Sequence, residues 1–156
     1  DGRRLRRWHM NRYRRDVATM LFDKNNLMPQ MDVAENIAMP LRVHGTARGK
    51  AIERALEILD SVGLPRSFAA LSPAMLSGGD QQRVAIARAL AADSQILLAA
   101  EPTRNLDVEN AAGVAQLLVA FARREGRCAV IATNDPTLEK FADGRIVLED
   151  GRARQE

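Results

Sequence analysis

Three short apolar runs recur along the chain, at residues 17–22, 95–100 and 128–133. None of them has the three- and four-residue spacing of an amphipathic helix, and none alternates with polar residues. Continuous apolar runs of this length are typical of strands that are buried on both faces of a parallel sheet. We therefore predict three parallel strands with both faces covered, and a buried thiol at Cys128 in the third run.

The segments between these runs have helical spacing. Apolar residues recur three and four positions apart from Ile52 to Leu59, and Gly63 follows as a natural stop. A second helix is expected to begin near Ser77 and to continue to about residue 91, and a third to run from about 108 to 124. Strands that alternate with helices predict βαβ crossovers and an α/β fold.

The end of the chain has a different pattern. Asp150-Gly151, the commonest kind of two-residue hairpin turn, separates two short segments at 145–148 and 152–154. We predict an antiparallel hairpin there.

Composition narrows the class of protein. The 156 residues are 46% hydrophobic, which suits one domain with a core, and no run approaches the roughly 20 apolar residues of a membrane span. Without a signal peptide, a cytosolic location is expected. The single cysteine excludes disulfide frameworks and multi-cysteine zinc sites.

The net charge of +3 is unevenly distributed, because residues 1–15 hold seven arginines and one aspartate. Clustered arginines with interleaved aromatic residues suit phosphates, so this segment is either a patch for nucleic acid or acidic lipid, or a solvated connector. The rest of the chain is net acidic and no recognition motif accompanies the arginines. We therefore expect no nucleic acid partner.

The segment from Leu76 to Leu90 carries the most specific chemistry. Ser77, Gly78 and Gly79 form a helix start that leaves backbone N–H groups uncovered, at the positive end of the helix dipole, where phosphate binds. The whole string resembles the signature motif of ABC-transporter ATPases. Other segments resemble that family's motifs in its own order: the Q-loop at 22–29, the first helix of the helical subdomain at 33–41, the Walker B strand at 96–103, the D-loop at 105–107 and the switch-histidine strand at 131–136.

Two segments, Pro102-Thr103 with Asn105-Leu106-Asp107 and residues 36–41, are most similar to the subgroup that serves lipoprotein release, macrolide export and cell division. The resemblance implies a three-layer α/β fold with a P-loop NTPase-like parallel sheet and a helical insertion. On this reading residues 1–156 are one partial domain, with the helical and signature subdomain at about 32–92 and parts of the catalytic core at 1–31 and 93–156. A sheet that lacks a strand leaves unpaired edges, so we also expect self-association.

The resemblance further implies a mechanism. Two such domains sandwich two ATP molecules, and closure and hydrolysis drive a transmembrane permease, so a second ABC ATPase domain and a permease are the expected partners. The location implied is cytoplasmic and peripheral to the inner or plasma membrane. Ser77, Gly78, Gly79 and Asp80 would contact the partner's ATP, with Asp107 in the D-loop, and Mg²⁺ accompanies ATP in the parent family.

Several positions depart from this pattern. No G-x-x-x-x-G-K-S/T string occurs in the sequence, and Asp1-Gly2-Arg3 looks like a hairpin that the family places after that motif. Ala100 stands at the Walker B aspartate position and offers Mg²⁺ no oxygen, although Glu101 remains at the position of the catalytic base. Asn134 replaces the switch histidine, Asp23 the Q-loop glutamine and Asp80 the signature glutamine.

Each change alone is consistent with drift, but together they fall on the positions that would touch nucleotide or metal. The leading hypothesis is a degenerate ABC ATPase fragment that neither binds nor hydrolyses ATP alone, with no cofactor of its own and no metal site. Two alternatives stay open: a non-catalytic partner that lends its signature motif to an intact subunit, and a working ATP-hydrolysing subunit when an upstream segment is present.

Overall fold

A computed structural model describes residues 13, 17–104 and 106–155. The basic segment, the Asp1-Gly2-Arg3 hairpin and Asn105 of the D-loop prediction therefore lie outside the described residues. The elements are β1 (Ala18–Leu21), α2 (Val33–Val43), α3 (Arg48–Ser61), 3₁₀ turns at Arg66–Phe68 and Pro73–Met75, α4 (Gly78–Ala91), β2 (Ile96–Ala100), α5 (Val108–Ala122), β3 (Cys128–Ala132), α6 (Pro136–Glu139), β4 (Ile146–Glu149) and β5 (Arg152–Gln155).

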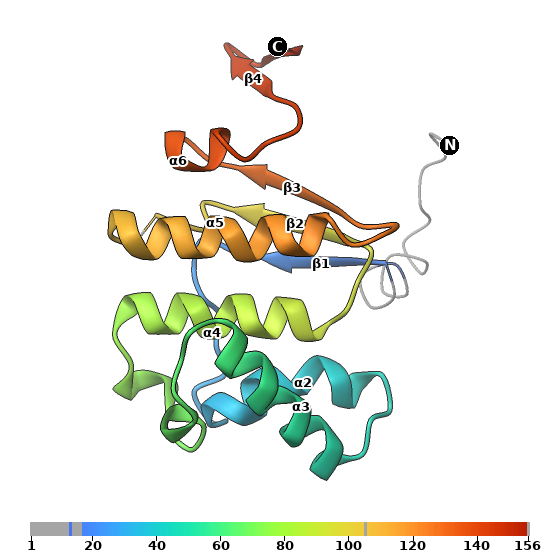
Figure 1. The fold of residues 1–156 in the computed structure, drawn as a ribbon, viewed down its shortest axis with the longest axis vertical. Helices are drawn as coiled ribbons and strands as arrows, with labels where there is room; N and C mark the ends of the chain where they lie inside the picture. Colours follow the sequence, from blue (N-terminus) through green and yellow to red (C-terminus); the bar gives the residue numbers. More distant parts are fainter. Residues whose placement is uncertain (1–12, 14–16, 105, 156) are drawn as a thin grey trace.

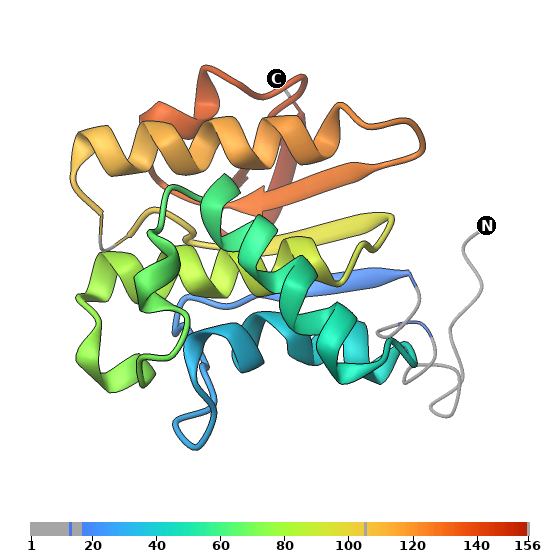
Figure 2. The ribbon, with the colours of Figure 1, turned by 60° about the horizontal axis from the view of Figure 1, so that its bottom comes forward.

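The sheet is parallel, with the strand order β1-β2-β3. Ala18 pairs with Ile96 and Ile96 with Cys128, so the three strands start level and end level. Helices α4 and α5 cover one face, and α2 and α3 pack beyond α4, away from the sheet (Figures 1 and 2). The predicted α/β class is confirmed, as are the three strands and the helices near 52–59, 77–91 and 108–124. The division into a helical subdomain and core parts stays a prediction.

The predicted hairpin is also present as β4 and β5, which pair antiparallel. Asp150 and Gly151 both have positive φ, at 47° and 74°. Two successive residues in the left-handed region give the turn whose twist matches that of the flanking strands, and an Asp-Gly pair adopts it readily.

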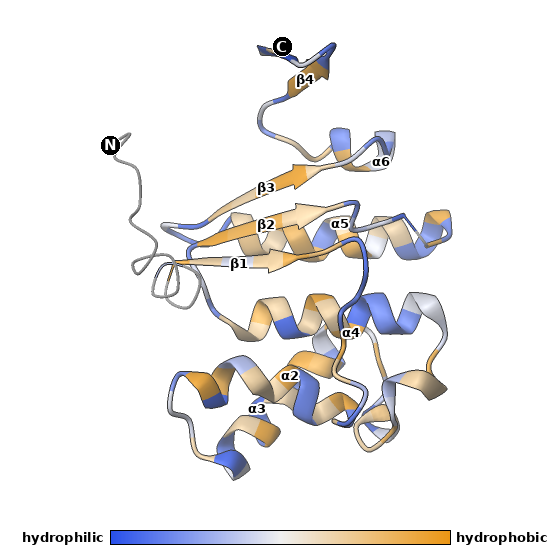
Figure 3. Cartoon of the chain, turned by 180° about the vertical axis from the view of Figure 1, so that it is seen from behind, coloured by the Kyte–Doolittle hydropathy of each residue, from blue (hydrophilic) through white to orange (hydrophobic). Residues whose placement is uncertain are grey.

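Within residues 17–104 and 106–155, no element covers one face of the sheet, which contradicts the prediction of strands buried on both faces. The side chains that point toward α4 and α5, such as Leu21, Leu97 and Ala99, are buried, whereas Met20 and Val130 on the opposite face are 52% and 55% exposed. Figure 3 shows this face, with apolar strands and no helix in front of them. A continuous apolar run shows that both sides of a strand are apolar, but it does not show that another element packs against both sides.

Cys128 lies on the uncovered face, in register with Ile96, and it is exposed. The prediction of a buried thiol is therefore wrong. In the part of the chain that the structure describes, no helix is both long and apolar enough to cross a bilayer.

Candidate functional site

The carboxyl ends of β2 and β3 meet at one edge of the sheet. The backbone N–H of Glu101, the residue after β2, donates to the carbonyl of Ala132, the last residue of β3, at 2.8 Å. A pocket of about 450 Å³ opens there, lined by residues that include Glu101, Thr103, Arg104 and Asn134. Loops that follow parallel strands form the usual ligand-binding edge of an open α/β sheet, which makes this the candidate site.

Glu101 is held in an uncommon backbone conformation. Its φ is +47°, in the left-handed region that non-glycine residues seldom adopt. Its half-buried carboxylate lies near the first residue after β3, where the hydroxyl of Thr133 is 3.5 Å from Oε2. Asn26, Asp93 and Asp150 share this conformation, so what distinguishes Glu101 is the combination of a strained backbone with a carboxylate that lines the pocket.

Thr103 and Asp135 join the two loops directly. The hydroxyl of Thr103, which is 4% exposed, donates to Oδ2 of Asp135 at 2.6 Å. The pKa of Asp135 is lowered, first by this hydrogen bond and then by the backbone N–H of Thr137, because both donors stabilise the ionised carboxylate. The sequence placed both residues within motifs but did not predict their contact, since nothing in a separation of 32 positions reveals that they touch.

Ala100 is the last residue of β2 and pairs with Ala132. Its side chain is a methyl group, and because side chains alternate along a strand it lies on the same side as Leu98, away from α4 and α5. Mg²⁺ requires oxygen ligands in near-octahedral array. Among the side chains of residues 96–101, only Glu101 offers an oxygen, so β2 lacks the second carboxylate that the family pattern places at its end.

The structure brings two further altered positions to this edge. Asn134 is exposed and lines the same pocket as Glu101. Asp23 is exposed in the loop after β1, and its Oδ2 lies 4.0 Å from Nη1 of Arg104. The Q-loop, Walker B and switch positions named by the sequence are therefore neighbours in space.

The start of α4 lies beside these loops but does not line the pocket. Ser77 is the N-cap: its Oγ accepts from the backbone N–H of Asp80 at 3.2 Å and donates to Oδ2 of Asp80 at 2.6 Å. Asp80 therefore places a carboxylate at the positive end of the helix, where it satisfies the Ser77 hydroxyl. Ser77 and Gly78 are exposed.

Gly79 connects this helix start to the segment after β2. A Cβ added at Gly79 would meet Cδ2 of Leu106 at 3.4 Å, which is an ordinary contact distance. The next residue, Asp107, is exposed and caps α5, and hydrogen bonds from Asn110 lower its pKa. The signature and D-loop positions named by the sequence are thus adjacent in space.

A family model described as ABC transporter matches residues 1–104. The chain belongs to the ABC transporter family. An ABC relative named lipoprotein-releasing system ATP-binding protein LolD 2, from Caulobacter vibrioides, is 43% identical over 140 residues, which are 90% of this chain and 61% of the relative. Another, an uncharacterized ABC transporter ATP-binding protein of Mycobacterium tuberculosis, is 39% identical over 143 residues, 90% of this chain and 56% of that protein.

A solved ABC structure has the same fold. The ATP-binding cassette MJ0796, determined as a dimer in a post-hydrolysis state bound to ADP and Pi, superposes with a TM-score of 0.90 at 36% identity, over 97% of this chain and 67% of that one. The resemblance to an ABC ATPase domain of the lipoprotein-release and macrolide-export type is therefore confirmed. The chain spans less than two thirds of the length of the curated relatives above.

Proposed function

We propose that these 156 residues are a degenerate ABC ATPase domain, which keeps the family's scaffold but neither holds Mg-ATP nor hydrolyses ATP by itself. The observation that carries the proposal is Ala100. The Walker B strand that the family resemblance assigns is formed and correctly paired, yet the position that would hold the metal bears a methyl group.

Three other positions support the proposal. Asn134 has no titratable ring, so it offers the γ-phosphate a neutral hydrogen bond in place of a positive charge. Asp23 and Asp80 place carboxylates where the family pattern has glutamines, and both would lie near phosphate. Glu101 keeps its carboxylate at the position of the base, but a base alone does not supply the missing charge stabilisation.

The proposal is tested by incubating the purified chain with magnesium and ATP and measuring released phosphate, with calorimetric titration of the same nucleotide. We expect no phosphate above buffer and no saturable heat. Turnover that the Glu101→Gln variant abolishes would contradict the proposal, because it would show that this carboxylate works without a Walker B aspartate. Ala100→Asp is the matched variant that restores the missing ligand type.

A second function has one observation in its favour. Ser77 and Gly78 are exposed at the start of α4, and adding a Cβ at Gly78 meets nothing within 4 Å. The exposed helix start supports a non-catalytic partner that lends its signature motif to the ATP of an intact ABC ATPase domain. A permease partner and a location at the cytoplasmic side of a membrane would follow from that role. The bond between Ser77 and Asp80 weighs against it, because it places a negative charge where a triphosphate would dock.

Mixing the chain with an intact ABC ATPase and measuring association with and without ATP tests this second function. Gly79→Asp is expected to abolish nucleotide-dependent pairing. Gly49→Asp is the matched control, since Gly49 is exposed near the start of α3 and a side chain there meets nothing within 4 Å. Pairing that persists in Gly79→Asp, or is lost equally in both variants, would exclude a specific contact through the signature.

A further inference from the structure

Helix α4 contacts two of the three loops at the candidate site, the loop after β1 and the turn after β2, through two side chains that its sequence pattern does not distinguish. Arg88 reaches the loop after β1, and Gln82 reaches the turn after β2. Six residues separate them, which is about 9 Å along a helix and places them on different faces.

Both terminal nitrogens of the Arg88 guanidinium donate hydrogen bonds to the same loop. Its Nη1 donates to the carbonyl of Asn26 at 2.7 Å and its Nη2 to the carbonyl of Asn25 at 2.8 Å. Among the residues that the structure describes, no carboxylate lies within ion-pair range of Arg88. Burial lowers the pKa of Arg88, so the charge is partly desolvated and its hydrogen bonds are made to neutral carbonyls alone. Such a two-pronged contact fixes orientation as well as distance.

The far end of the same loop is fixed separately. Asn36, fully buried on α2, accepts from the backbone N–H of Met28 at 2.8 Å and donates to the carbonyl of Met31 at 3.1 Å. The end nearer the site, which carries Asp23, has no such anchor on α2. Its backbone is held to the helices by Arg88, and Asn26 there has a φ of +46°.

Gln82 makes the corresponding contact on the other side. It is 2% exposed, and its Nε2 donates to the carbonyl of Pro102, directly after Glu101, at 2.9 Å. Its Oε1 is buried and has no hydrogen-bond partner in the described part of the chain. Burying an unpaired amide oxygen costs free energy, so the side chain is poorly explained as packing alone.

We propose that Arg88 and Gln82 are positioning residues that attach the Asp23 loop and the Pro102 turn to one helix, so that both segments follow α4 as a unit. The helix that begins at Ser77 thereby sets the relative placement of the loops at the candidate site. This inference goes beyond the proposed function, because it holds whether or not the chain turns over ATP.

Spin labels on the full chain test the proposal. One nitroxide is attached at Lys24→Cys and, in a separate protein, at Arg104→Cys, both exposed, in a Cys128→Ser background. In Arg88→Gln we expect the spectrum at position 24 to shift toward its fast-motion component while that at 104 is unchanged. In Gln82→Met we expect the spectrum at position 104 to shift toward its fast-motion component while that at position 24 is unchanged. Arg83→Gln is the matched control, because it removes a guanidinium from the same helix. In the described part of the chain, that guanidinium makes only a 3.5 Å hydrogen bond to the carbonyl of Gly63.

A purely structural role would lower the melting temperature without this selectivity. If the label at 24 is as immobile in Arg88→Gln as in the parent, or Arg83→Gln mobilises it equally, the assignment of Arg88 is overturned. Arg88→Lys decides the case in which Arg88→Gln does not fold. The single ammonium group of lysine cannot donate to the carbonyls of Asn25 and Asn26 in the paired geometry of a guanidinium. In Arg88→Lys, an intermediate spectrum at position 24 therefore supports the proposal, and a parent-like spectrum overturns it.

Discussion

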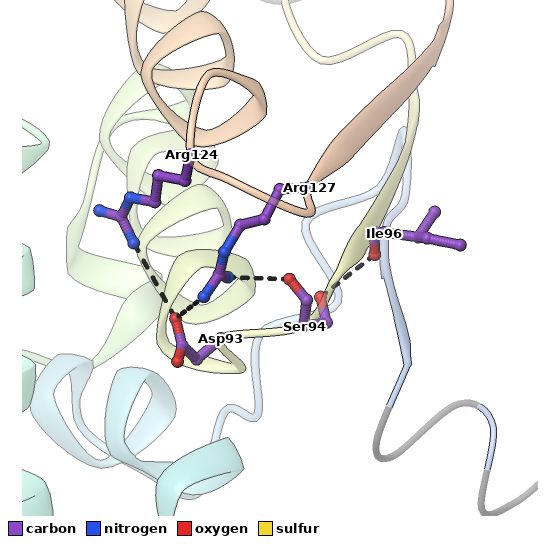
Figure 4. Close-up of polar contacts among 5 residues, drawn as sticks. All are labelled: Asp93, Ser94, Ile96, Arg124 and Arg127. Carbon is purple, nitrogen blue, oxygen red and sulfur yellow. Dashed lines mark hydrogen bonds and ion pairs between the residues drawn. The ribbon is translucent and has the colours of Figure 1, made fainter.

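The guanidinium of Arg127 donates to Oδ1 of Asp93 at 2.7 Å and joins the turn after α4 to the turn after α5. Figure 4 shows the same side chain reaching the carbonyl of Ser94, at 2.8 Å, beside the start of β2. The guanidinium carbon also lies 5.3 Å from the ring centre of Phe121. These contacts of Arg127 lie at the end of the sheet where the strands begin, opposite the candidate site.

Replacing Arg127 is expected to destabilise the fold. Arg127→Gln removes two charge-assisted hydrogen bonds from a side chain that is 17% exposed, and we expect the free energy of unfolding to fall by about 1–3 kcal/mol. Arg124→Gln is the control, because Arg124 lies 3.9 Å from the same carboxylate but is 59% exposed, so a change of about 0–0.5 kcal/mol is expected. Urea denaturation measures both. Equal losses in the two variants would contradict the burial argument.

The bond between Thr103 and Asp135 is expected to make stability depend on pH. Thr103→Val should cost about 1 kcal/mol at neutral pH, because it removes a donor from a partly exposed carboxylate. The folded-state pKa of Asp135 is lowered, so its contribution is fully present above the ordinary carboxyl pKa and is lost as pH falls through the lowered value.

The measurement is denaturation of the parent and Thr103→Val at several pH values. The difference in unfolding free energy should be largest near pH 7 and should shrink below about pH 4. Asp135→Asn completes a double-mutant cycle, and a difference that is independent of pH would show that Thr103 acts by packing rather than through the carboxylate.

Cys128 is expected to react with a thiol reagent in the native state. It is exposed on the uncovered sheet face, so a water-soluble disulfide reagent should modify one thiol per chain without denaturant. The measurement is absorbance of the released chromophore at low protein concentration. Reaction that begins only when the protein unfolds would show that this face is covered in solution.

The uncovered sheet face is also expected to drive self-association. Met20 and Val130 expose apolar surface on it, and contiguous exposed apolar surface promotes contact between copies. Sedimentation should show a weight-average mass that rises with concentration, and Met20→Gln with Val130→Thr should reduce the rise. Met75→Gln is the control, because Met75 is 70% exposed but lies away from the sheet, and it should leave the association unchanged.

Much of the fold follows from local pattern. The apolar runs became β1, β2 and β3, the spacing from Ile52 to Leu59 became part of α3, and Asp150-Gly151 became the hairpin turn. These elements depend on side-chain period and on backbone preferences within a few residues, which a sequence displays directly. The family resemblance likewise named Asp23, Glu101 and Asn134 as site positions, and the structure shows that they lie at one edge of the sheet.

The contacts that connect distant parts of the chain could not be read in this way. Thr103 and Asp135 are 32 positions apart, and Arg88 meets Asn25 across 63. Nothing in the spacing of a helix specifies which loop an arginine on its surface will reach. Burial was equally hard to predict: the apolar neighbours of Cys128 suggested a buried thiol, whereas its side chain is exposed.

The sequence by itself determined the kinds of element, their order and the chemistry available at each strand end, including the methyl group at Ala100. Only the tertiary structure decided which face of the sheet is covered, and which loops α4 holds. Secondary structure is set by interactions between near neighbours, whereas burial and long-range hydrogen bonds depend on which elements pack together once the chain has folded.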